Sequence, residues 1–150
     1  MIKLVRTNSK NEAFIALVNL LNGYLKTVDG TEHDFYMQYN NIDVLNHVVI
    51  AYHDSIPVGC GAFKKFDDDA VEIKRMFTLP EYRGKGVATL ILKELETWAK
   101  EARYNICVLE TGKRQIEAVN FYKKKRYQVI PNYGPYKDIA NSLCFKKILS

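Results

Sequence analysis

A helix that begins without a capping side chain is the feature that most constrains this sequence. The stretch EYRGKGVATLILKELETWAK, residues 81–100, opens as a polar loop with Gly84 and Gly86 and then becomes a patterned helix. Ser, Thr, Asp or Asn usually cap such a start, because the first N–H groups have no partner inside the helix. Apolar residues three or four apart should fix the helix on a sheet: Val87, Ile91, Leu95, Trp98 and Ala102.

Positive charge gathers at the same helix start. Arg83 and Lys85 lie on either side of Gly84, and the helix macrodipole adds about half a positive charge at this end. The glycines bare the backbone and allow a ligand to approach closely. These features predict an anion site with room for more than one phosphate. A P-loop would need Ser or Thr after Gly-Lys, and the dinucleotide fingerprint would need glycine at Thr89, so neither motif fits.

Length and composition indicate one globular domain, residues 1–150. Hydrophobic residues make up 47% and charged residues 26%, which is an ordinary balance for a chain that buries a core. Lys and Arg number 22 against 17 Asp and Glu, a net charge of +5 that suits a phosphate-bearing molecule, nucleic acid or an acidic membrane without choosing among them. The three cysteines lie far apart in apolar runs, so we expect neither disulfides nor a metal site.

Two further expectations concern location. We recognise no secretory signal, and no apolar run approaches the ~20 residues of a membrane span. We therefore expect a cytoplasmic protein with no membrane partner.

The hydrophobic pattern predicts the order β-α-β-β-β-α-β-α-β-β, a mixed α/β domain. Besides the helix after Gly86, helices are predicted at 11–25 and 115–125. Strands are predicted at 2–6, 47–54, 57–66, 70–79, 105–110, 127–130 and 141–149. The three strands between residues 47 and 79 should form an antiparallel meander. The segment 27–46 is predicted to be a loop with a short helix.

The sequence RGKGVA, Arg83 to Ala88, resembles the pyrophosphate loop of the GCN5-related N-acetyltransferase (GNAT) superfamily. That loop has the pattern Arg/Gln-x-x-Gly-x-Gly/Ala, and Arg83, Gly86 and Ala88 match its three fixed positions. The longer stretch VEIKRMFTLPEYRGKG resembles the fourth strand of the family and the loop that follows it. The order of elements agrees with the family along essentially the whole chain.

A second stretch, IEAVNFYKKKRY, resembles a later helix of the family, with Ala118 and Tyr122 in its Ala-x-x-x-Tyr pattern. Two residues depart from the family. Gln115 stands where Asn is common, and Arg126 stands where Gly is common before Tyr127.

The resemblance implies a mixed, mostly antiparallel sheet flanked by helices. It also implies an enzyme that transfers acetyl from acetyl-CoA directly to an amine. Backbone groups of the fourth strand would pair with the pantetheine arm, and the loop would hold the phosphates. The implied cofactor contacts are Met76, Phe77, Thr78, Arg83, Gly84, Lys85, Gly86, Val87, Ala88, Thr89 and Ala118.

The chemistry requires a proton donor and a proton acceptor. Tyr122 matches the tyrosine of the family that protonates the departing thiolate. Glu72 is the first candidate for removing the amine's proton, Glu110 is the second, and a water chain is the third. Strand alternation places Glu72 and Met76 on one face and Phe77 on the other, unless a bulge, which the family has in this strand, shifts the pattern.

The acceptor is expected to be the primary amine of a small molecule. Candidate substrate-binding residues are Glu32, His33, Tyr36, Glu110 and Tyr133. Three alternatives stay open: acetylation of a protein N-terminus or lysine, a non-catalytic module that binds CoA or nucleic acid, and covalent catalysis by Cys107. A homodimer is compatible with the sequence, whereas a nucleic-acid partner is not favoured.

Overall fold

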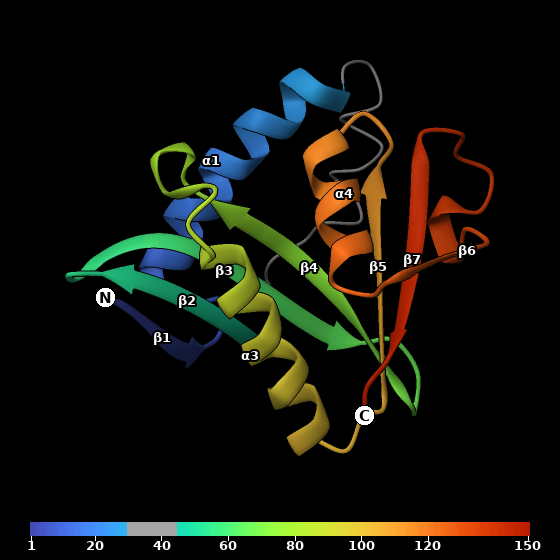
Figure 1. Cartoon of the computed structure of the whole chain (residues 1–150), viewed down its shortest axis with the longest axis horizontal. Helices are drawn as coiled ribbons and strands as arrows, with labels where there is room; N and C mark the ends of the chain where they lie inside the picture. The colour runs from blue at the N-terminus through green and yellow to red at the C-terminus, as the bar shows by residue number, and fades with distance from the viewer. Residues whose placement is uncertain (30–44) are drawn as a thin grey trace.

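The computed structural model of this protein describes residues 1–29 and 45–150, and a seven-stranded sheet forms its centre (Figure 1). The strand order is β1-β2-β3-β4-β5-β7-β6. The predicted sequence of elements is confirmed. Their bounds are β1 Ile2–Thr7, α1 Glu12–Asp29, β2 His47–His53, β3 Ile56–Lys65, β4 Ala70–Thr78, α3 Val87–Glu101, β5 Ile106–Gly112, α4 Ile116–Lys124, β6 Gln128–Ile130 and β7 Ser142–Ile148.

Two short 3-10 turns complete the described elements, at Pro80–Tyr82 and Gly134–Tyr136. Helix α1 continues past residue 25, its predicted end, to Asp29. The predicted helix within 27–46 falls mainly on residues outside the described part of the chain.

Helices cover the sheet on both faces. Strands β1 to β4 pair antiparallel in sequence order, which confirms the meander. Alternate residues of β2 face opposite sides: Val49 and Ala51 join a core with α3 and α4, and Val48 and Ile50 join a core with α1. Because both faces are covered, β2 is apolar along most of its length.

Helix α3 lies close to β3 because two residues of β3 that face the helix are glycines. A Cβ atom added at Gly59 would lie 2.9 Å from Cδ1 of Ile91, and one added at Gly61 would lie 2.9 Å from Cδ1 of Leu95. The residues that α3 buries are Val87, Ile91, Leu92, Leu95 and Ala99. The prediction was wrong at Ala102, which is the exposed C-cap of the helix, while Trp98 is half-buried.

Strands β4 and β5 run parallel but stay together only at their N-terminal ends. Their pairing joins Ala70–Glu72 to Ile106–Val108. Strand β5 then pairs with β7 up to Gly112, whereas β4 follows β3 to Thr78. The two strands consequently diverge toward their C-terminal ends, as Figure 1 shows. This divergence makes room at the centre of the sheet.

A bulge interrupts β4 at Arg75. The register against β3 shifts between Cys60 and Ala62, and Arg75 has a φ of +60°. Simple alternation is therefore wrong beyond this point. Met76 packs in the core on the α3 side and Phe77 in the core on the α1 side. A sequence pattern cannot show where such an extra residue lies.

Helix α4 ends in the turn where the sequence departs from the family. Arg126 takes the left-handed conformation that glycine usually supplies there, with a φ of +72°. The N–H of Tyr127 donates to the carbonyl oxygen of Tyr122 at 3.0 Å, which closes the helix end. The turn therefore forms with arginine in place of glycine, although arginine is strained in this backbone conformation.

Candidate active site

Two adjoining cavities lie where β4 and β5 diverge. The larger, about 320 Å³, lies against the end of β4, the start of α3 and one side of α4. The smaller, about 110 Å³, lies between β4 and β5 and reaches α1. Both are lined by Leu21, Met76, Gln115, Ala118 and Tyr122, so they meet along a shared wall.

The larger cavity gathers the residues predicted to contact the cofactor. Lys85 is the exception: its Nζ lies 5.5 Å from the centre of the Tyr82 ring, and it does not line the cavity. The predicted residues that do line it are Met76, Phe77, Thr78, Arg83, Gly84, Gly86, Val87, Ala88, Thr89 and Ala118.

The start of α3 has the uncapped geometry that the sequence predicted. Gly86 is the N-cap, with a φ of +83° and no side-chain hydrogen bond, and Gly84 has a φ of +76°. A Cβ atom at either glycine would meet nothing within 4 Å. Backbone conformation, rather than crowding by the protein, therefore selects glycine here. The open space before the helix N–H groups fits the phosphates of a coenzyme.

Arg83 connects this loop to β4 and α1. Its Nε donates to the carbonyl oxygen of Thr78 at 3.0 Å. Its guanidinium lies 5.5 Å from the ring centre of Tyr24 and 5.8 Å from that of Phe77. The positive charge is thereby held at the wall of the larger cavity.

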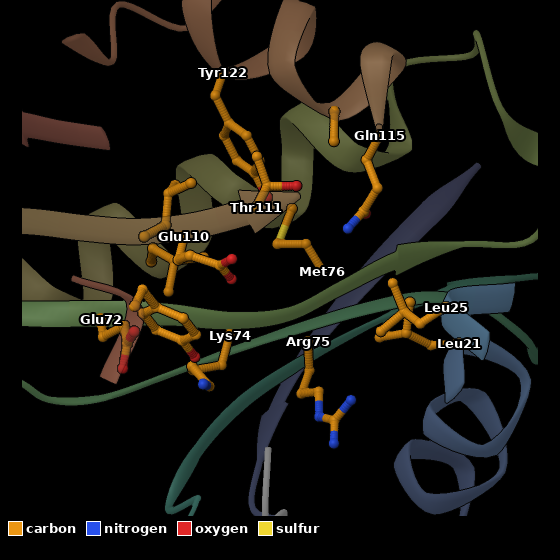
Figure 2. Close-up of a pocket in the computed structure, with 14 residues that line it drawn as sticks. Leu21, Leu25, Glu72, Lys74, Arg75, Met76, Glu110, Thr111, Gln115 and Tyr122 are labelled. Atoms are coloured by element: carbon orange, nitrogen blue, oxygen red, sulfur yellow. The ribbon is translucent and has the colours of Figure 1, made fainter. Parts of the chain in front are cut away.

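Tyr122 stands between the two cavities. It is 7% exposed and reaches from α4 toward the space that Glu110 enters from β5 (Figure 2). Burial raises the pKa of Tyr122 above its usual value, so the phenol keeps its proton at neutral pH. A protonated phenol at this point can donate to an atom in either cavity.

Glu72 lies on the β4 side of the smaller cavity, where Figure 2 also shows Lys74. Glu72 is buried, with 5% of the residue exposed. Its Oε2 accepts a hydrogen bond from Tyr133 at 2.7 Å, and its Oε1 lies 3.9 Å from Nζ of Lys64. Burial and the neighbouring Glu72 charge raise the pKa of Tyr133. Tyr133, expected to bind substrate, therefore holds Glu72 in place.

Some residues that line the smaller cavity were not predicted from the sequence, and some predicted residues lie outside the part of the chain that the structure describes. Lys74 and Arg75 both line the smaller cavity. The resemblance implied a bulge in this strand, but no local pattern placed it at Arg75. Glu32, His33 and Tyr36 lie outside the described residues.

Covalent catalysis by Cys107 finds no support in the geometry. Cys107 is 0% exposed on β5 and lines neither cavity. Burial raises the pKa of its thiol to about 12, which leaves almost no thiolate at neutral pH. Cys60 and Cys144 are likewise fully buried.

Residues 1–29 and 45–150 contain no group of three or more His, Cys, Asp or Glu side chains placed to hold a metal ion. None of the helices found there has the length and apolar character needed to cross a membrane.

The decisive comparison is with models of protein families. Residues 14–126, most of the chain, match the model of the Acetyltransferase (GNAT) family. This chain belongs to the GNAT acetyltransferase family. The resemblance found in the sequence is therefore confirmed, and acetyl-CoA is the acetyl donor that the family uses.

Individual relatives agree with this assignment. An IAA acetyltransferase of Azospirillum brasilense is 26% identical over 99% of this chain and 98% of its own length. A Klebsiella pneumoniae structure, named as an acyl-CoA N-acyltransferase, has a TM-score of 0.84 at 24% identity, covering 100% of this chain and 99% of that one. A GNAT acetyltransferase of Elizabethkingia anophelis with acetyl-CoA bound has a TM-score of 0.72 at 17% identity, covering 99% of this chain and 98% of that one. The structural likenesses confirm the fold of the acetyltransferase.

A matched pair of substitutions tests the anion site of this acetyltransferase. Asn and Asp have nearly the same shape and both tolerate positive φ, so Gly86→Asn and Gly86→Asp differ mainly in one negative charge. We expect Gly86→Asp to bind acetyl-CoA roughly 10- to 100-fold more weakly than Gly86→Asn, because the carboxylate would repel the phosphates. Calorimetric titration with acetyl-CoA gives the two affinities.

The folded state supplies the control for this pair. An aspartate at a helix N-terminus favours the helix, so Gly86→Asp should melt at no lower temperature than Gly86→Asn. Equal affinities of two folded variants would show that the phosphates bind elsewhere.

Proposed function

We propose that this acetyltransferase, as a single domain over residues 1–150, moves acetyl from acetyl-CoA directly to the primary amine of a small molecule. One observation carries the proposal. A protonated phenol, Tyr122, and two carboxylates, Glu72 and Glu110, surround a small cavity that adjoins the cofactor cavity. Direct transfer needs a donor for the leaving sulfur and an acceptor for the amine's proton at one place.

The cofactor would bind along the larger cavity. Beyond Glu72, the edge of β4 that faces β5 has left the ladder, and an open strand edge is a template for an extended ligand. We assign this role to the backbone of Met76, Phe77 and Thr78. The carbonyl oxygen of Thr78 already accepts a hydrogen bond from Arg83. The backbone groups of Met76 and Phe77 would therefore pair with the amides of the pantetheine arm.

The other end of the cofactor would lie at the start of α3. The N–H groups of Val87, Ala88 and Thr89 point to the open space before Gly86, and Gly84 lets the loop pass closely. Lys85 is exposed on the same loop and adds positive charge at longer range. Ala118 is small enough for the acyl end to pass α4.

Tyr122 would donate to the sulfur of the departing thiolate. A thiol has a pKa of about 8.5, below that of the buried phenol, so full proton transfer to the thiolate is uphill. A hydrogen bond to the developing charge needs no full transfer and still lowers the barrier.

Glu72 is our first choice for the group that receives the amine's proton. It lies on the wall of the smaller cavity, and Tyr133 fixes its orientation. Glu110 faces the same cavity from β5 and is the second choice, directly or through water. A cavity of about 110 Å³ suits a small molecule. A cytoplasmic location and a homodimer remain predictions from the sequence.

Thiol release from acetyl-CoA, measured over a panel of amines with wild type and Tyr122→Phe side by side, tests the proposal. Wild type should release thiol only when an amine is present. Tyr122→Phe removes one oxygen from α4 and should lower kcat by roughly 10- to 1000-fold, with acetyl-CoA affinity little changed. An unchanged kcat, with the chemical step rate-limiting, would show that Tyr122 only packs against the sheet.

The same panel separates the alternative functions. Release only with peptides that carry a free N-terminus or lysine would mean protein acetylation. Binding to DNA that weakens with salt, without any thiol release, would mean a non-catalytic module. Acetylation of small amines supports the proposed function.

The role of Glu72 follows from a pH–rate comparison of wild type, Glu72→Gln and Glu110→Gln. If Glu72 receives the proton, Glu72→Gln should be slow at neutral pH and recover partly at high pH, where more of the amine is free. If Glu72 binds a cationic substrate by charge, the variant should raise KM and spare kcat. If the pH–rate profile of Glu72→Gln matches that of wild type while the profile of Glu110→Gln is altered, Glu110 rather than Glu72 receives the amine's proton.

A further inference from the structure

The smaller cavity is lined by charges of both signs. Among its described lining residues, Glu72 and Glu110 are acidic and Lys74 and Arg75 are basic, so their formal charges cancel. Lys74 and Arg75 do not line the larger cavity, which places them away from the phosphate site at the start of α3. An amine needs a carboxylate nearby to take its proton, but it gains nothing from two cations. Besides balancing the two carboxylates, Lys74 and Arg75 bring positive charge to the wall of this cavity, where an anionic group of a ligand could bind.

Arg75 is the more unusual of the two cations. The residue is 7% exposed, although an arginine is rarely buried to this degree. Burial lowers its pKa to about 10, so it still carries its charge at neutral pH. Its Nη1 donates to Oδ1 of Asn22 on α1 at 2.8 Å, which fixes the direction of the guanidinium. A fixed and buried guanidinium is suited to a planar anion.

The backbone at Arg75 adds to this argument. The bulge holds the residue at a φ of +60°, where glycine or asparagine would be less strained. An arginine at this position lowers the stability of the fold in two ways, through backbone strain and through the burial of a charged side chain. Strain of this kind persists at sites where function requires a particular side chain.

Lys74 brings a second positive charge to the same cavity. Burial is the main cause that lowers the pKa of its ammonium group, and the charges of Lys64 and Arg75 lower it further, while Glu72 and Glu110 act in the opposite direction. Figure 2 shows Lys74 and Arg75 on the same side of the cavity, with Tyr122 across from them. An acceptor whose amine approaches Tyr122 would turn its far end toward these two cations.

We infer that the acceptor is a zwitterion, an amino acid whose carboxylate is bound by Lys74 and Arg75 while its amine receives the acetyl group. This inference rests on the proposed function and names the class of its substrate. The carboxylate would accept two hydrogen bonds from the Arg75 guanidinium and an ion pair from Lys74. A diamine would instead bring its second ammonium group against both cations.

Amino acids and their carboxamides provide the test, because each pair keeps the carbon chain and the amine and removes only the anionic group. The ammonium group of a carboxamide has a lower pKa than that of the amino acid, so more of the carboxamide is present as free amine at a given pH. Each rate of thiol release is therefore divided by the concentration of unprotonated amine. Wild type should show a kcat/KM about 10- to 100-fold higher for the acid than for its amide, with the difference mainly in KM. Diamines and simple alkylamines should be poorer still.

Three variants identify the residues responsible. Arg75→Gln keeps a donor for Asn22, and Lys74→Met keeps most of the side-chain volume; each should bring the acid-to-amide ratio down to about one to three. Lys65→Met is the matched control, because Lys65 is exposed, pairs with Asp68 at 3.1 Å and lines neither cavity. It also removes one positive charge and should keep the wild-type ratio. If Arg75→Gln does not fold, wild type and Lys74→Met alone decide the question.

The outcomes separate this inference from the function on which it rests. Acetylation of small amines with no preference for a carboxylate, or with a preference for diamines, overturns the inference and leaves the proposed function standing. A ratio that Lys74→Met does not change overturns it as well. Absence of acetylation with every small amine removes the proposed function, and the inference with it.

Discussion

The ladder between β4 and β5 ends after Glu72 and Val108, and both cavities depend on that ending. If the parallel pairing continued, β5 would cover the edge of β4 from residue 73 to residue 78, and no ligand could lie along it. The antiparallel pairing of β5 with β7 carries β5 away in the other direction. Helices on opposite faces then close the opening: Leu21 of α1 and Tyr122 of α4 line both cavities.

The bulge at Arg75 decides which side chains reach each face of the opening. One extra residue turns Met76 toward Gly61 and α3, and it turns the arginine toward Asn22 and α1. The carboxylate of Glu72 lies before the bulge and keeps its hydrogen bond from Tyr133. A strained residue in one strand thus places Met76 in the core with α3 and Arg75 beside α1. The buried charges that result are costly alone and are stabilised by one another.

Local patterns in the sequence predicted much of this arrangement. The order of elements and the uncapped start of α3 at Gly86 follow from periodicity and from turn residues, which act over a few positions. Ala102 lies on the periodic face of α3, yet the helix ends there, beyond the edge of the core. The pairing of Tyr133 with Glu72 joins residues far apart in the chain, so no local pattern indicates it. The family resemblance implied a bulge in this strand, but its position depends on the register against β3, which no local pattern indicates.

Initial-velocity kinetics test most directly whether acetyl passes straight from one cavity to the other at Tyr122. Thiol release is measured while acetyl-CoA and an accepted amine are both varied. Direct transfer requires both substrates to be bound together, so we expect intersecting double-reciprocal lines and no acetylated protein after incubation with acetyl-CoA alone. Parallel lines, together with an acetyl group retained on the chain, would contradict it.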